Sequence, residues 1–216
     1  MICYIDKLKE GDSMMKSPLE EYAPYRLLAL FILIVFYGIY LAKAWIQKRC
    51  GIQTHQIGKR KEKSVHTVET VMGIATVSII PVQLLSIVFG WNHLPANARF
   101  TGFCVGVIGD LIFLISVLCM KDSWRAGIPE KDKTKLVTDG IYKYSRNPAF
   151  LGFDFQYIGI SLIYFNLLTL IFTIFAVTML HLQILQEEKY LTATFGAEYQ
   201  SYQRQVFRYL GRKREK

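Results

Sequence analysis

The sequence lacks the residue clusters that usually hold metal ions or disulfide bonds. Its four cysteines are scattered without a Cys-x-x-Cys pair, and its four histidines show no metal-binding spacing. A cysteine inside an apolar segment usually packs as a small hydrophobic group. We therefore expect neither a disulfide framework nor a zinc site, and no metal at the functional site.

The first 24 residues lack the apolar centre of a cleavable signal peptide. They are mixed in charge, and Met14 and Met15 are alternative start positions. We expect residues 1–24 to form a non-cytoplasmic N-terminal segment.

Charged residues are nearly absent from several long stretches, although the chain carries a net charge of +9 and is 52% hydrophobic. This combination favours a small integral membrane protein over a soluble domain. Anionic lipid headgroups attract basic loops, so the positive charge requires no nucleic-acid partner.

Long apolar runs predict an all-α, polytopic membrane protein with about five transmembrane helices. The first three spans are expected within residues 25–120, at 27–42, 70–92 and 100–120. The last uncharged run, 155–186, would reach roughly 48 Å as one helix, whereas the apolar slab is about 30 Å thick.

A C-terminal helical hairpin that turns near Asn166 resolves this excess length, with spans at 149–165 and 167–186. The alternative is a single span whose end projects into water as an amphipathic helix. We favour the hairpin, which gives five crossings.

Basic residues predict the orientation. Lys and Arg concentrate between spans one and two, between spans three and four, and after the last span, whereas only Arg99 lies between spans two and three. Basic loops remain in the cytoplasm, so both large loops and the C-terminus should be cytoplasmic. We expect a multi-pass protein of the plasma membrane in a prokaryote, or of the endoplasmic reticulum in a eukaryote.

Two polar segments flank the expected hairpin. In "GIYKYSRNPAFLG" (140–152), the Asn147-Pro148 pair disfavours an ordinary helix just before the fourth span. Read alone, this segment is an interfacial anchor of Tyr and Arg side chains at headgroup depth. Glu187 and Glu188 end the last apolar run, which as an isolated pair would mark the water boundary. The hairpin should bring both segments to the same membrane face.

Together these segments resemble the integral membrane methyltransferases that include isoprenylcysteine carboxyl methyltransferase and phosphatidylethanolamine N-methyltransferase. The resemblance covers roughly Ser123 to Leu210. It rests on "LVTDGIYKYSRNPAFLG" against L-V-x-x-G-x-Y…R-H-P-x-Y-x-G, and on "EEKYLTATFGAEYQSY" against E-E-x-x-L…F-G-x-x-Y-x-x-Y. It implies that residues 121–216 form a methyltransferase core with a cofactor loop, the hairpin and a C-terminal cytoplasmic helix.

The resemblance implies an S-adenosylmethionine site that faces the cytoplasm and a lipid or lipid-like methyl acceptor. The implied cofactor-binding residues are Lys135, Leu136, Val137, Tyr142, Asn147, Pro148, Phe150, Glu187 and Glu188. Asn147 and Gln183 are the implied catalytic positions. A carboxylate such as Glu187 can pair with the cofactor ammonium, and Tyr142 can supply an apolar wall. We expect Glu188 to matter less if it points to water.

The sequence departs from the carboxyl-methylating branch at two positions. Its R-H-P is Arg146-Asn147-Pro148 here, and Gln183 stands where that branch has an Arg one helical turn before the Glu pair. Glutamine lacks the charge and the fork that orient a carboxylate. His181, Arg204 and Arg208 are substitutes at other positions. We therefore predict an amine or another uncharged nucleophile as acceptor, rather than a prenylcysteine carboxylate.

Asp110 and Asp154 lie inside expected spans, where a carboxyl group is costly in lipid, so both should face the protein interior or a cavity. Asp154 lies near the cytoplasmic boundary, where an interfacial position is the alternative to contact with the substrate. For Asp110 a hydrogen bond between helices is favoured over a catalytic role. Trp124 and Arg125 could cover the cofactor or anchor the chain at the interface. Two alternatives to the methyltransferase remain: an NADPH-dependent membrane reductase resembling the sterol reductases, and a non-enzymatic transporter or scaffold.

Overall fold

The computed structural model describes residues 18–58, 62–128 and 135–213. The expected N-terminal segment, with Met14 and Met15, therefore lies largely outside the described residues. The described part is helical, which confirms the all-α prediction. The elements are α2 (Pro18–Arg49), α3 (Lys63–Phe89), α4 (Ala96–Met120), η1 (Lys121–Ser123), η2 (Gly140–Lys143), α5 (Pro148–Ile163), α6 (Leu167–Phe195) and α7 (Ala197–Gln205).

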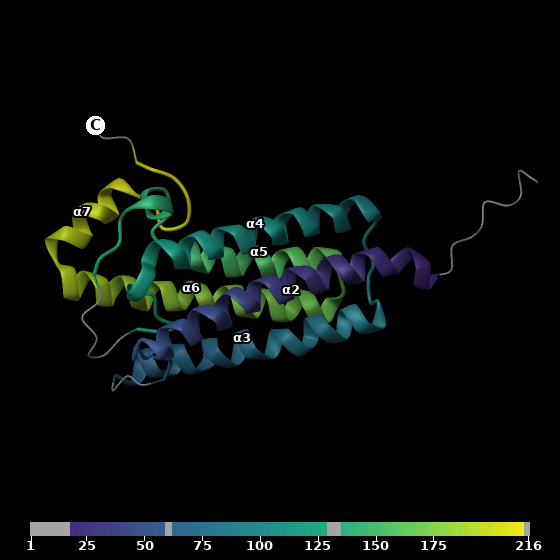
Figure 1. The fold of residues 1–216 in the computed structure, drawn as a ribbon, viewed down its shortest axis with the longest axis horizontal. Helices are drawn as coiled ribbons and strands as arrows, with labels where there is room; N and C mark the ends of the chain where they lie inside the picture. The colour runs from purple at the N-terminus through teal and green to yellow at the C-terminus, as the bar shows by residue number, and fades with distance from the viewer. Residues whose placement is uncertain (1–17, 59–61, 129–134, 214–216) are drawn as a thin grey trace, which may run out of the picture.

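The five long helices, α2 to α6, run side by side along the long axis of the molecule (Figure 1). The α2–α3 connection, the loop that carries η2, α7 and the C-terminal tail gather at one end. The α3–α4 and α5–α6 turns meet at the opposite end, where the His93 N–H donates to the Phe165 carbonyl at 3.0 Å. The two predicted polar segments therefore lie at the same end of the bundle.

Four helices are long and apolar enough to cross a membrane, namely α2 from Pro24, α3, α4 together with η1, and α6. They extend beyond the expected spans because each helix continues into polar sequence. The apolar helix α5 is shorter, since its 16 residues reach roughly 24 Å at about 1.5 Å per residue. The prediction of a polytopic membrane protein is confirmed, with α5 as a short fifth apolar helix.

Asn166 ends the connection between α5 and α6 and starts the last helix. Its side-chain oxygen accepts from the Thr169 N–H at 3.0 Å, while the Thr169 hydroxyl accepts from the Asn166 N–H at 3.2 Å. This reciprocal capping box satisfies backbone donors that the first turn of a helix leaves free. The predicted hairpin at Asn166 is confirmed, and the single long span is wrong.

Glycine lets α4 and α5 pack with their backbones in contact. A Cβ atom at Gly159 would lie 2.6 Å from the Gly106 nitrogen and 2.7 Å from the Gly102 oxygen. Small residues allow such close approach between helices in membranes. The pairing fixes the start of α5, and with it the Asn-Pro loop, beside the end of α4.

The two acidic residues of the spans are buried, as predicted. Asp110 is 4% exposed and Asp154 is 8% exposed. However, neither carboxyl oxygen of Asp110 has a hydrogen-bond partner among the described residues. The expected hydrogen bond from Asp110 to a neighbouring helix is therefore wrong, because no polar side chain of the described helices reaches it.

Candidate functional site

A cavity of about 1140 Å³ opens at the end of the bundle where the large loops gather. Small-molecule sites usually measure roughly 300–1,000 Å³, so this volume accommodates a cofactor and part of a second ligand. Its walls come from helices α2 to α7, from η1 and η2, and from residues of the loops at 55–58, 124–127, 135–137 and 146–147.

Most of the predicted cofactor residues line this cavity, and they come from both motif segments. They are Lys135, Leu136, Val137, Tyr142, Asn147, Phe150 and Glu187. Three other predicted site residues do not line it: Pro148 starts α5, and Gln183 and Glu188 are buried behind the wall. The fold thus brings the loop and the end of α6 together as the hairpin predicted.

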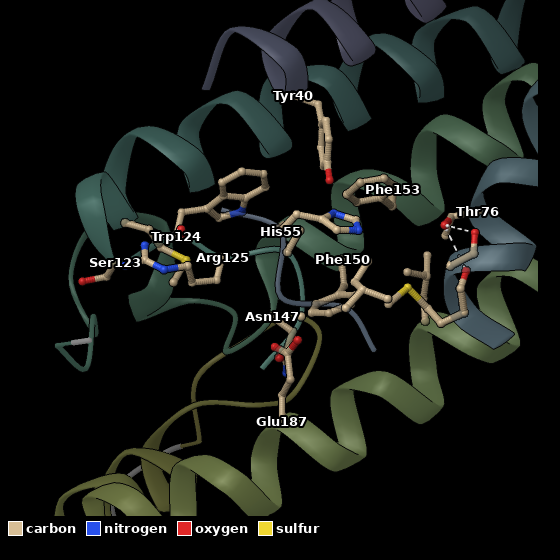
Figure 2. A pocket seen from close by; sticks show the side chains of 18 of the residues that line it. Tyr40, His55, Thr76, Ser123, Trp124, Arg125, Asn147, Phe150, Phe153 and Glu187 are labelled. Carbon is tan, nitrogen blue, oxygen red and sulfur yellow. Dashed lines mark hydrogen bonds between the residues drawn. The ribbon is translucent and has the colours of Figure 1, made fainter. Parts of the chain in front are cut away.

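Glu187 presents its carboxylate to the cavity from α6. In Figure 2 its side chain rises from the helix toward Asn147. Gln183, one turn earlier and fully buried, donates from Nε2 to Glu187 Oε1 at 3.1 Å. Gln183 therefore orients the Glu187 carboxylate and does not itself face the cavity.

Glu188 points in another direction and holds two arginines. Its Oε1 lies 2.8 Å from Arg146 Nη2, and its Oε2 lies 2.9 Å from Arg208 Nη2. Arg208 Nε also donates to Oε1 at 3.1 Å, and this hydrogen bonding raises the pKa of the Arg208 guanidinium. Glu188 does not point to water, because the tail folds back over the end of α6 and buries it. The condition under which Glu188 is expected to matter less is therefore not met.

The C-terminal tail also binds the Asn-Pro loop through its backbone. The Arg146 N–H donates to the Phe207 carbonyl at 3.1 Å, and the Gly211 N–H donates to the Tyr144 carbonyl at 2.6 Å. Asn147 Nδ2 donates to the Arg208 carbonyl at 3.2 Å. The tail thus holds the Asn-Pro loop in place, although none of the described tail residues after Gln205 lines the cavity.

Tyrosines of α7 and η2 complete this wall. The Tyr202 hydroxyl donates to the Tyr142 carbonyl at 2.6 Å, and both side chains line the cavity. Burial raises the pKa of Tyr142 well above its usual value, and it also raises the pKa of Tyr202. Both phenols therefore remain neutral and serve as hydrogen-bonding and packing groups.

Two proposed substitutes for the missing arginine are engaged elsewhere. Arg208 is held by Glu188, and the His181 ring lies 2.5 Å from the Tyr209 hydroxyl. Neither residue lines the cavity, and Arg204 does not line it either. Among the described residues, the basic side chains in the wall are instead Lys135, Arg125, Arg146 and His55.

The wall opposite Glu187 was largely missed by the sequence reasoning. Figure 2 shows His55 projecting into the cavity near Phe153, with Tyr40 and Trp124 on the same side. Trp124 and Arg125 both line the cavity. The sequence alone left open whether they cover the cofactor or anchor the chain at the membrane interface. The α2–α3 connection that carries His55 has no recognisable motif, so no signal marked it.

One arm of the cavity extends along α3 between apolar side chains. Leu41, Ile74 and Val77 line this arm and are 64%, 58% and 67% exposed. Helix α3 packs mainly against α6 and makes little contact with α2. The arm is therefore open on the side of the bundle, between α2 and α3, at a level where both helices are apolar.

Removal of the Glu188 charge should destabilise the protein. In Glu188→Gln, Arg146 and Arg208 would remain without a carboxylate, and breaking a buried ion pair in this way costs on the order of 3–5 kcal/mol. Thermal unfolding in detergent should show a clearly lower midpoint. The matched control is Glu198→Gln, at an exposed position of α7, which should unfold near the wild-type midpoint. Equal midpoints for both variants would contradict the structural role of Glu188.

Comparison with known proteins finds similarity over part of the chain. The sequence model of the Isoprenylcysteine carboxyl methyltransferase (ICMT) family matches residues 102–193. The protein-S-isoprenylcysteine O-methyltransferase of Saccharomyces cerevisiae is 42% identical over 72 residues, which are 33% of this chain and 30% of the yeast protein. The Schizosaccharomyces pombe protein of the same name is 38% identical over 72 residues, with the same shares.

A probable protein-S-isoprenylcysteine O-methyltransferase of Oryza sativa subsp. japonica is 30% identical over 110 residues, which are 50% of this chain and 58% of the rice protein. The chain thus spans between about a third and somewhat more than half of these relatives. The matched region holds most of α4, the Asn-Pro loop, α5 and the part of α6 that carries Glu187. Over residues 102–193, the chain is similar to the isoprenylcysteine carboxyl methyltransferase family.

Proposed function

We propose that this chain transfers a methyl group from S-adenosylmethionine to a lipid-like acceptor in the membrane. The observation that carries the proposal is a single cavity that combines a carboxylate, aromatic walls and an apolar arm open on the side of the bundle. The relatives' names, all O-methyltransferases, support the same reaction class. The reductase and transporter alternatives are not favoured, because nothing in the site or the relatives supports them.

The residues present fit S-adenosylmethionine, which supplies an activated methyl group on a sulfonium centre. Glu187 would pair with its ammonium group in a partly desolvated place, where charge-assisted hydrogen bonds are strong. Tyr142 and Phe150 would form the wall against its apolar parts. Asn147, held by the Arg208 carbonyl, has a fixed side chain at the same wall.

The protein's contribution to the reaction is alignment and exclusion of water. In the transfer, an acceptor atom bonds to the methyl carbon while the carbon–sulfur bond breaks, and the bonding electron pair stays on sulfur. Such an in-line displacement needs correct distance and angle more than acid–base chemistry. The buried loop, α6 and the tail supply a rigid frame for that alignment.

We propose that the acceptor enters from the bilayer between α2 and α3. Leu41 and Val77 are exposed to the side of the bundle and also line the arm, so an apolar chain can slide between them without crossing water. The basic loops at the cavity end support a cytoplasmic location for the cofactor entrance.

The position of Gln183 does not decide the chemistry of the acceptor atom. The preference for an amine assumed that residue 183 faces the acceptor, yet Gln183 is buried and bonds Glu187. Without that assumption, the relatives' names favour the carboxylate of an isoprenylcysteine. Arg125 and His55 lie in the wall where such a carboxylate would need a partner.

The cofactor assignment predicts a defect in binding for Glu187→Gln. Loss of a charge-assisted hydrogen bond to the ammonium costs roughly 1.5–3 kcal/mol, which corresponds to a weakening of tenfold or more. Calorimetry with S-adenosylhomocysteine, which retains the ammonium, should show this change at an unaltered unfolding temperature. Unchanged affinity would rule out the role of Glu187.

The acceptor proposal is tested with labelled S-adenosylmethionine and purified protein in lipid. One reaction receives a farnesylcysteine analogue and the other an aminophospholipid. Base-labile methyl ester should form in the first reaction and exceed any transfer in the second by at least about tenfold, since an unsuited acceptor loses alignment. Efficient N-methylation with no ester would restore the amine prediction.

A further inference from the structure

Two loop segments form one continuous wall of the cavity, which we call the two-loop cover and define as residues 54–58 and 124–128. The Ala126 N–H donates to the Thr54 carbonyl at 3.0 Å, and the Gln56 N–H donates to the Ala126 carbonyl at 2.8 Å. These bonds form an isolated parallel bridge between His55 and Ala126. His55, Ile57 and Gly58 from one segment, and Trp124 to Gly127 from the other, line the cavity.

The close approach of the two segments depends on Gly127. Its φ of +90° lies in the region that favours glycine. A Cβ atom there would lie 2.9 Å from the Ile57 nitrogen. The segments are therefore in backbone contact, and a displacement of one would move the other.

Glu69 holds the far end of the cover. This residue of α3 is completely buried, and its Oε2 accepts from the Gly58 N–H at 2.8 Å. Its Oε1 accepts from the Ile128 N–H at 3.0 Å. One carboxylate thus binds the backbone of both segments, yet it does not line the cavity itself.

Gln47 of α2 holds the other end. Its Nε2 donates to the Trp124 carbonyl at 2.9 Å, and its Oε1 accepts from the Thr54 hydroxyl at 2.7 Å. Gln47 is 1% exposed. The cover is thereby fixed to α2 and α3, the two helices that border the apolar arm and make little contact with each other.

We propose that Glu69 is a positioning residue for the methyl-transfer site: through the Gly58 and Ile128 amides, it holds the two-loop cover in the place from which His55 and Trp124 face the cofactor and the acceptor. This inference rests on the proposed function. It assigns a role to a residue outside the matched family region, in a part of the chain that no motif marks. The carboxylate is required because both of its oxygens accept a backbone hydrogen bond, whereas an amide offers one acceptor and turns a donor toward the second N–H.

The test compares Glu69→Gln with Glu62→Gln, a matched control whose carboxylate is exposed near the start of α3. Affinity for S-adenosylhomocysteine is measured by calorimetry, and hydrogen exchange of peptides covering 54–58 and 124–128 is followed by mass spectrometry. In Glu69→Gln we expect the rate of hydrogen exchange in both segments to rise about tenfold. We expect the dissociation constant for S-adenosylhomocysteine to rise by about the same factor. In Glu62→Gln, the unfolding temperature, the hydrogen exchange of both segments and the dissociation constant should all stay near the wild-type values.

The outcomes separate this inference from the proposed function. Wild-type protein that binds no S-adenosylhomocysteine would overturn both. If the wild-type protein binds S-adenosylhomocysteine and a folded Glu69→Gln protein binds it with the same affinity, only the positioning role is overturned. If Glu69→Gln does not fold, Gln47→Met decides the matter, because it releases the opposite end of the cover: weaker cofactor binding supports the inference, and unchanged binding contradicts it.

Discussion

The candidate site depends on the pairing of one buried carboxylate. Glu188 binds Arg146 of the Asn-Pro loop and Arg208 of the tail, so three segments that are distant in sequence meet at one residue of α6. An unpaired charge in this place would cost several kcal/mol, so the loop and the tail cannot leave α6 separately. Since neighbouring residues on a helix point in different directions, the same anchoring turns Glu187 toward the cavity.

The two halves of the chain contribute different parts of the cavity. The half that matches the family supplies the carboxylate of α6 and the aromatic loop, which together suit the cofactor. The N-terminal half supplies α2, α3 and the first segment of the two-loop cover, which border the apolar arm. If the proposed function holds, the cofactor residues lie mainly in the matched region, and the apolar arm for the acceptor is bordered mainly by the N-terminal part of the chain.

The sequence predicted the fold where simple lengths and local chemistry decide the structure. The last apolar run was too long for one crossing, and Asn166 has the side chain that caps a new helix, so the hairpin followed. Pro148 at the first position of α5 likewise fixed the end of the loop. From the hairpin, the meeting of the Asn-Pro loop with Glu187 follows from the sequence alone.

Other features depended on tertiary contacts that no local pattern records. Glu188 looked like a water-boundary residue because its partner Arg208 comes from a tail with no apolar periodicity. Gln183 was assigned to the acceptor because a motif gives the helix position and not the direction in which the side chain points. The proposed roles of His55 and Glu69 both depend on irregular loops: His55 lies in one, and Glu69 of α3 accepts hydrogen bonds from two. The path of these loops is set by backbone hydrogen bonds between distant segments.

The proposed binding of S-adenosylmethionine in the cavity between the Asn-Pro loop and α6 can be measured directly. Ultraviolet cross-linking of the purified protein with labelled S-adenosylmethionine, followed by peptide mapping, tests it without any knowledge of the acceptor. The label should attach to peptides that contain residues 136–150 or 183–191, and an excess of unlabelled S-adenosylhomocysteine should remove it. Competed labelling confined to peptides outside the cavity wall, or no competed labelling at all, would contradict the account.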